Sequence, residues 1–339
     1  MLSGTRLAFG VLTVVSSLAL ASCDSGVTEP LVSADASGPL LARKKAPPGS
    51  TTPPPPTDTT TAPAPAPSPT PTPTGATPVF SDGFDTGARS PQQNGYGWTF
   101  TQNGADGDAV GISSTVARTG AYSMKFTYGG NANLCDDAFS EQRFTLGENL
   151  PEAWFEYYVF IPAGGTAAGT KFYHRSPTCA AENDANGINS NNKFFALWDV
   201  DYIDKDVRVM VEYRRSKTAA DGDSYMYGMW CSDTRVCSDW GWPGHLWDPA
   251  FTDAMKGRWV QVRIHAKVAD SKATANGLLE VWVDGALRIN MKNLDLAASA
   301  GGNNWFRNGY LMGWSNSGFN QTTAVYLDDF KIFRSSPGW

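Results

Sequence analysis

Strict alternation of apolar and polar residues is the feature that most limits how this chain folds. The clearest example is WVQVRIHAKV (259–268), where Val, Ile and Ala alternate with Gln261, Arg263, His265 and Lys267. A period of two places the apolar residues on one side of a β-strand and the polar residues on the other. The segment therefore predicts a strand with one buried face, and its other face carries an imidazole between two cations.

Strand-like runs of this kind recur through residues 79–339, between turns rich in Gly, Asn, Asp and Ser. The Asp-Gly pair in VDGAL (283–287) is typical of a hairpin turn, and no long amphipathic helix is indicated. Many antiparallel strands with one apolar face predict an all-β fold, a sandwich of two antiparallel sheets. The expected strands are 122–128, 153–162, 192–200, 206–215, 259–268, 278–289, 309–315 and 324–333.

The N-terminal part has a different composition. Residues 1–22 carry Arg6 and a short apolar run, which predicts a secretory signal peptide. The run ends in LASC, which resembles the lipobox of bacterial lipoproteins. The resemblance implies a lipidated Cys23 in the bacterial cell envelope, at the outer membrane or cell surface; the alternative is an ordinary signal with a chance cysteine. Residues 23–78 hold 13 Pro within 47–78 and predict a disordered tether.

The net charge of −6 belongs to the predicted domain of residues 79–339, because the charges of residues 1–78 cancel. All 12 Trp lie in this domain. A net acidic domain without a basic stripe disfavours nucleic acid as a partner. An acidic polysaccharide would need a local basic groove to overcome the overall sign. We expect a monomer that contacts a membrane only through its lipid.

Four cysteines remain in the domain once Cys23 is set aside. An even number in an exported domain predicts two disulfides, with three alternative pairings. The short loop between Cys231 and Cys237 makes these two the first expected pair, followed by Cys135 with Cys179. The spacing is not that of a zinc site.

Three stretches resemble the concanavalin A-like jelly rolls: SDGFDTG near residue 81, GRWVQVRIHAKV with NGLLEVWVDGALRI in the middle, and VYLDDFKIF near the end. Within that superfamily they are most similar to the jelly-roll polysaccharide lyases, the heparin-lyase-I-like and the alginate- and glucuronan-lyase-like groups. The resemblance implies a jelly-roll sandwich whose glycan groove lies on the outward face of one sheet. Lectin-like modules share these motifs, so the resemblance leaves the function open.

The polar faces of three expected strands indicate a first candidate site. If 206–215, 259–268 and 278–284 share a sheet, their Arg, His, Lys and Trp residues line one surface suited to an acidic sugar. β-Elimination beside a uronate needs a base, a group that neutralises the carboxylate and an acid for the leaving oxygen. We expect His265 as base, Arg263 or Arg214 as neutraliser and Tyr158, Tyr213 or Tyr225 as acid. Arg208, Gln261, Lys267 and Trp282 would bind the sugar. The alternative is that these charges pair across strands.

Two loops offer further candidates. In GTKFYHRSPTC (169–179), Tyr173 and His174 are a second acid and base, with Asn192 and Lys193 nearby in the sequence as sugar-binding residues. Around the expected short disulfide, exposed indoles would stack on sugar rings, unless they form a local mini-core. These tryptophans are Trp230, Trp240, Trp242 and Trp247.

We expect no required cofactor, although Asp82 and Asp328 could hold a structural calcium ion, as in related modules. The sequence thus favours a surface-anchored lyase that cleaves a uronate-containing polysaccharide by β-elimination. The alternative is a non-catalytic carbohydrate-binding or adhesion module of the same fold. Whether the chain is an enzyme stays open at this point.

Overall fold

The computed structural model describes ten stretches of the chain. For residues 191, 213–215, 224–231 and 248–251 it describes the backbone alone. The described stretches are 75–105, 107–129, 138–162, 191–202, 206–215, 224–231, 248–251, 255–299, 301–315 and 322–339. Outside them lie the signal peptide, Cys23, the tether as far as residue 74, Tyr173, His174, Trp240, Trp242, Trp247 and the cysteines 135, 179 and 237.

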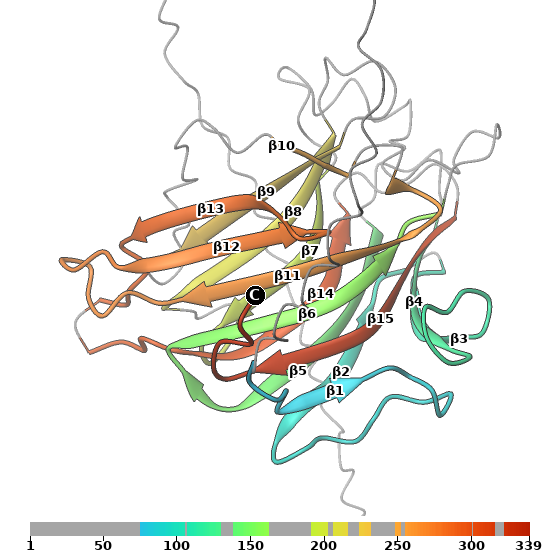
Figure 1. The fold of residues 1–339 in the computed structure, drawn as a ribbon, viewed down its shortest axis with the longest axis horizontal. Coiled ribbons are helices and arrows are strands. Elements are labelled where there is room, and N and C mark those ends of the chain that lie inside the picture. Colours follow the sequence, from blue (N-terminus) through green and yellow to red (C-terminus); the bar gives the residue numbers. More distant parts are fainter. Residues whose placement is uncertain are drawn as a thin grey trace, which may run out of the picture. The chain divides into compact units, whose positions relative to one another are not determined.

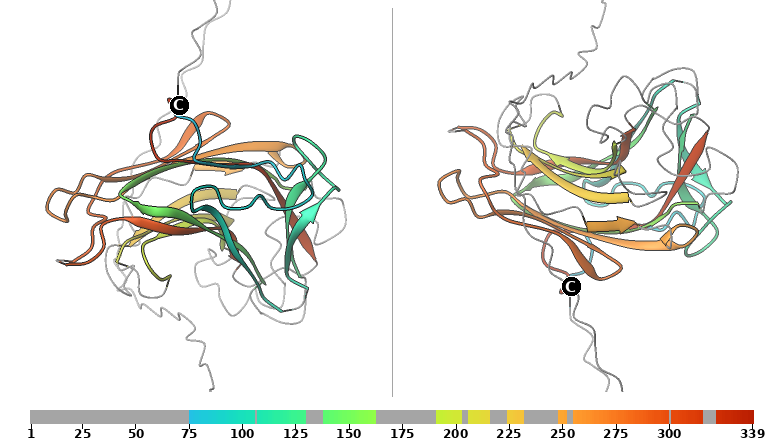
Figure 2. Two further views of the ribbon diagram at one scale, coloured as in Figure 1. Left: turned by 90° about the horizontal axis from the view of Figure 1, so that it is seen from below. Right: turned by 90° about the horizontal axis from the view of Figure 1, so that it is seen from above.

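Two antiparallel sheets form the domain and pack face to face (Figures 1 and 2). The eight-stranded sheet, called sheet A, runs in the order β13-β12-β11-β6-β15-β4-β3, and β1 also pairs with β15. Its strands are β1 (Phe80–Asp82), β3 (Ala109–Ser113), β4 (Ser123–Tyr128), β6 (Glu152–Phe160), β11 (Trp259–Lys267), β12 (Gly277–Val283), β13 (Ala286–Leu294) and β15 (Thr323–Phe333).

The seven-stranded sheet, called sheet B, runs in the order β10-β9-β8-β7-β14-β5-β2. Its strands are β2 (Tyr96–Asn103), β5 (Ala138–Leu150), β7 (Asn191–Trp198), β8 (Arg208–Arg215), β9 (Ser224–Cys231), β10 (Asp248–Phe251) and β14 (Phe306–Ser315). The predicted all-β sandwich is therefore confirmed. Within the described residues, no helix has the length and apolar character needed to cross a membrane.

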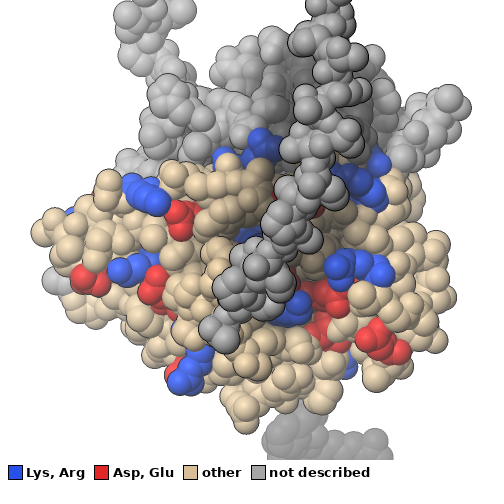
Figure 3. Space-filling view, viewed as in Figure 1, with Lys and Arg blue, Asp and Glu red and all other residues tan. Residues whose placement is uncertain are grey.

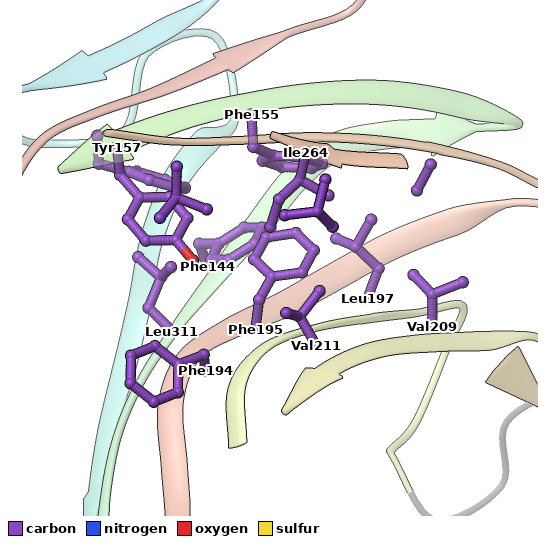
Figure 4. Packing of buried hydrophobic residues seen from close by; sticks show 14 of the residues in the cluster. Phe144, Phe155, Tyr157, Phe194, Phe195, Leu197, Val209, Val211, Ile264 and Leu311 are labelled. Atoms are coloured by element: carbon purple, nitrogen blue, oxygen red, sulfur yellow. The ribbon is translucent and has the colours of Figure 1, made fainter. Parts of the chain in front are cut away.

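The core between the sheets is built from the apolar half of each alternation. In β11 the burial alternates residue by residue, and Val262 and Ile264 are fully buried. They meet apolar side chains of sheet B, among them Phe195 and Val211 (Figure 4). Because the side chains of one strand alternate between faces, this packing directs Arg263 and His265 to the outward face of sheet A.

The turn between β12 and β13 is the hairpin expected from VDGAL. Asp284 and Gly285 both have positive φ, at 48° and 78°, which is the backbone that a two-residue type I′ turn needs. The strands on either side pair antiparallel, with Val283 opposite Ala286. The strand-like run 278–289 is thus two strands joined by the expected turn, β12 and β13.

Candidate functional site on the outward face of sheet B

The strands expected to form one surface are divided between the two sheets. β11 and β12 lie in sheet A, but β8, which carries Arg208 and Arg214, lies in sheet B. The prediction that His265 and Arg263 share a face with Arg214 is therefore wrong. Alternation within a strand specifies which residues are buried, but it does not specify which sheet the strand joins.

On the outward face of sheet A, the polar side chains pair with one another. His265 lies between two carboxylates, with Nε2 2.7 Å from Glu152 and Nδ1 3.0 Å from Glu280. Its ring stacks on Trp154, with 4.6 Å between the ring centroids. Glu280 also pairs with Lys292 at 3.0 Å. These contacts give His265 a structural role, and its catalytic role stays a prediction.

Glu156 is the centre of a second network on this face. It accepts hydrogen bonds from Arg263 Nε at 2.8 Å, Lys331 Nζ at 2.8 Å and Gln261 Nε2 at 3.0 Å. Gln261 also donates to the Tyr158 hydroxyl at 2.9 Å. Burial alone raises the pKa of the Glu156 carboxyl, but Lys331 and Arg263 outweigh it and leave the pKa below its usual range.

The C-terminal residues contact the same face of sheet A. The Trp339 ring lies 5.3 Å from the Trp282 ring, and the Arg263 guanidinium lies 5.1 Å from the Trp339 ring centroid. In the view of Figure 3, which is that of Figure 1, Lys and Arg lie beside Asp and Glu rather than in a block of one sign. Of the predicted residues here, Arg263, His265, Gln261 and Trp282 all contact protein groups.

Sheet B has a second set of side chains on its outward face. Phe195, Leu197, Val209 and Val211 point into the core. Their strand neighbours therefore point outward, and a separate apolar cluster forms there. It consists of Ala196, Trp198, Met210 and Tyr310, with Tyr202 packed against it. In the strand register, Arg143, Tyr310, Ala196 and Met210 follow one another across β5, β14, β7 and β8.

Arg143 lies among aromatic rings on this face. Its guanidinium is 4.7 Å from the Phe100 ring centroid, 5.4 Å from that of Trp198 and 5.9 Å from that of Tyr202. It donates to the side chain of Glu141 and to Gln102 Oε1, the latter at 3.2 Å. Cation–π contacts and a charge-assisted hydrogen bond fix a guanidinium in one orientation. Arg143 is thus a positioned cation on the face of the sheet.

Glu141 is a buried carboxylate next to this cation. Burial raises its pKa, while Arg143 and, at longer range, Lys193 lower it in part. Beside it, β14 bulges between Leu311 and Ser315, and Met312 and Gly313 have φ of 58° and 146°. Positive φ at a residue other than Gly costs energy and is concentrated at functional sites. The strained backbone therefore marks this part of sheet B.

Two tyrosines and a second arginine lie on the other side of Trp198. The hydroxyls of Tyr202 and Tyr310 are each 3.9 Å from Met210 Sδ, and the two ring centroids lie 5.7 Å apart. Burial raises the pKa of Tyr310 well above its usual range, whereas Tyr202 is only half-buried. The Arg208 guanidinium lies 5.1 Å from the Tyr202 ring centroid.

Three predicted sugar-binding residues are placed in sheet B. Lys193 is opposite the buried Glu212 in the ladder, and Arg208 is opposite Trp198. Lys193 is half-buried. Asn192, one residue earlier, is buried and pairs with Ser315 across the ladder. The side chains of Tyr213, Arg214, Tyr225, Trp230 and Cys231 lie outside the described part, so their predicted roles and both disulfides stay predictions.

The sequence analysis missed Glu141, Arg143, Trp198, Tyr202, Tyr310 and Met210. β5 was not expected as a strand, because its core-facing positions include Ser140 and Gln142, which are polar. The charged residues Glu141 and Arg143, two positions apart, are the sequence signal that could have indicated the outward face of this strand. For Tyr202, which follows β7, no pattern in the sequence indicated the site.

Asp82 and Asp328, the predicted calcium ligands, accept hydrogen bonds from protein donors. Asp82 accepts from Phe84 N, Ser90 N, Ser90 Oγ and Trp98 Nε1 at 2.6–2.9 Å. Asp328 accepts from backbone N–H groups, with Arg118 N at 2.8 Å, and burial raises its pKa to about 6. Calcium binding at these carboxylates stays a prediction. The described residues contain no cluster of three or more His, Cys, Asp or Glu fit for a metal ion.

Comparison with solved structures finds distant matches, all at low sequence identity. An endo-β-1,4-glucuronan lyase from the fungus Trichoderma reesei is 12% identical, covers 76% of this chain and 95% of its own, and has a TM-score of 0.45. The alginate lyase Aly36B is 10% identical over 76% and 97%, with a TM-score of 0.47. An alginate lyase from Chlorella virus is 13% identical over 71% and 93%, with a TM-score of 0.42.

The sequence was also compared with curated proteins and with profiles of protein families. No curated protein matches the chain. A family profile described as polysaccharide lyase matches residues 84–331, which is well over half of the chain and takes in both sheets. This chain therefore belongs to the polysaccharide lyase family.

Proposed function

We propose that the protein cleaves a uronate-containing polysaccharide by β-elimination, and that the outward face of sheet B is its active site. The observation that carries the proposal is that Arg143 and Arg208 lie next to the rings of Trp198 and Tyr202 on that face. Lys193 lies on a neighbouring part of β7, opposite Glu212, and interacts electrostatically with Glu141. Local cations overcome the overall acidity of the chain, and rings bind the apolar sides of sugars. On sheet A, Arg263, His265 and Lys331 contact carboxylates, and on sheet B Arg143 pairs with Glu141.

The chemistry of the cations divides their roles. A guanidinium keeps its proton in proteins, so Arg143 and Arg208 can neutralise the uronate carboxylate but not remove a proton. An amine can release its proton and then accept another. Lys193 is the only amine among the described side chains of this face. We assign it the removal of the C5 proton.

Elimination also needs an acid that donates a proton to the leaving glycosidic oxygen. Tyr202 is the half-buried phenol beside Arg143 and Arg208, and we assign it this role. Tyr310 is fully buried, so it supports Tyr202 rather than reaching the sugar. Tyr225, opposite Arg214 in the ladder, is the competing acid.

The test is turnover of a panel of uronate glycans, followed by the ultraviolet absorbance of the unsaturated product. The panel includes alginate and β-1,4-glucuronan, the glycans in the names of the similar structures. We expect Lys193→Ala to lower kcat by roughly 10²–10⁴-fold, the usual contribution of a general base. Arg258→Ala is the control, because Arg258 is an exposed residue just before β11 of sheet A and is paired with Asp284. Full turnover by Lys193→Ala contradicts the assignment.

Tyr202→Phe and Tyr225→Phe identify the acid. Each substitution removes one hydroxyl and keeps the ring, so only loss of the donated proton should lower kcat. If only Tyr225→Phe loses turnover, the general acid is Tyr225 of β9 rather than Tyr202.

A non-catalytic binding module is the second candidate, favoured by the exposure of Phe100 and Trp314 on the same face. Binding of a panel glycan without any unsaturated product would identify it. For location, we propose export and lipidation at Cys23, supported by the LASC motif. Incorporation of labelled palmitate by the wild type but not by Cys23→Ser tests this; equal labelling refutes it.

A further inference from the structure

We infer that Trp314 and Phe139 form a separate sugar-stacking subsite at one end of the outward face of sheet B, which binds a further ring of the glycan chain. The inference rests on the proposed function, because it assumes that the chain lies across Arg143. Trp314 is 36% exposed, whereas Phe139 beneath it is 4% exposed. An exposed indole next to a glycan site is a binding surface, because a sugar ring buries its apolar area.

Phe139 supports the indole from below. The two ring centroids lie 4.5 Å apart with the planes tilted by 34°, and the residues are opposite each other in the ladder of β5 and β14. The backbone of Phe139 is fixed on both sides: its N–H donates to Asp108 at 2.6 Å, and its carbonyl accepts from Gly104 N at 2.7 Å. The platform is therefore held in place before any sugar binds.

The register gives the distance between this platform and the cations. Phe139 and Arg143 are four residues apart on β5, and their side chains point to the same face. At roughly 3.3 Å per residue the separation is about 13 Å. This is longer than one sugar ring, so a glycan with its uronate at Arg143 reaches Trp314 with a different residue of the chain.

The chemistry of the subsite determines its kinetic effect. An indole face carries no charge and contacts C–H groups, and it lies away from the bond that breaks. It therefore binds substrate and transition state equally, which lowers KM without raising kcat. Only glycan chains long enough to reach from Arg143 to Trp314 bind more tightly because of this subsite.

The experiment compares Trp314→Ala, Trp314→Phe and the wild-type protein on two substrates. These are the polymer of the panel that is cleaved best and the shortest oligosaccharide that is still cleaved. We expect Trp314→Ala to raise KM for the polymer about three- to tenfold, the loss of one stacking contact. We expect kcat and the KM of the short substrate to be unchanged, and Trp314→Phe to restore most of the affinity. Leu287→Ala, a similarly exposed apolar residue of sheet A, is the control.

Two kinetic results would overturn the inference: an unchanged KM for the polymer, or an equal loss on both substrates. If the wild type cleaves no glycan of the panel, the proposed lyase function fails, and the subsite is tested by Kd for alginate and β-1,4-glucuronan in affinity electrophoresis. Weaker binding by Trp314→Ala than by Leu287→Ala then supports it. Equal binding by both, or no binding by the wild type, overturns it.

Discussion

Replacement of His265 by Ala separates a structural role from a catalytic one. The change removes two contacts with carboxylates, Glu152 at 2.7 Å and Glu280 at 3.0 Å, and the stacking on Trp154. A hydrogen bond to a charged group contributes about 1.5–3 kcal/mol when buried, and less at the partly exposed Glu152. Stacking adds about 0.5–1.5 kcal/mol. We expect the free energy of unfolding to fall by about 2–4 kcal/mol, allowing for partial exposure.

Urea unfolding with linear extrapolation measures this loss, and kcat under native conditions measures activity per folded molecule. We expect kcat to be unchanged, because His265 and the cations of sheet B lie on different sheets. Lys267→Ala is the matched control: it lies on the same face of β11, and a surface substitution should change stability by less than about 0.5 kcal/mol. Loss of turnover with an unchanged free energy of unfolding would refute this reasoning and make His265 catalytic.

Two further predictions concern the residues that hold the sandwich together. Asp82→Ala should lower the free energy of unfolding by about 3–5 kcal/mol, because four hydrogen bonds to a buried carboxylate are lost and their donors remain. Urea unfolding measures this loss. A loss below about 1 kcal/mol, the contribution of one ordinary hydrogen bond, would contradict the prediction. Glu156, whose pKa is lowered by Lys331 and Arg263, stabilises the fold above its unfolded pKa of about 4.3, and this stability is lost as the pH falls through its folded pKa. Glu156→Gln should therefore flatten the acid side of a plot of Tm against pH, and parallel curves would speak against the network.

The sequence by itself determined the class of fold. The alternation in 259–268 and the Asp-Gly pair in 283–287 are local properties, because the side-chain period and the turn backbone depend only on neighbouring residues. The structure has a strand and a hairpin at these places. Strand β5 was not predicted because a local pattern counts polar residues as outward-facing, and β5 has polar residues at core-facing positions. Gln142 faces inward although it is polar, and its amide is satisfied by groups of β2, with the Thr101 hydroxyl 2.8 Å from its side-chain oxygen.

Only the tertiary structure decided which strands lie side by side, and so where the site lies. The strands that carry His265 and Arg214 look alike in sequence, yet one strand is in sheet A and the other in sheet B. The alternation is the same for either sheet, because both bury one face against a common core. Arg143 and Tyr202, 59 positions apart in the chain, meet only because β14 lies between β5 and β7. That pairing depends on long-range contacts, which no local pattern of residues contains.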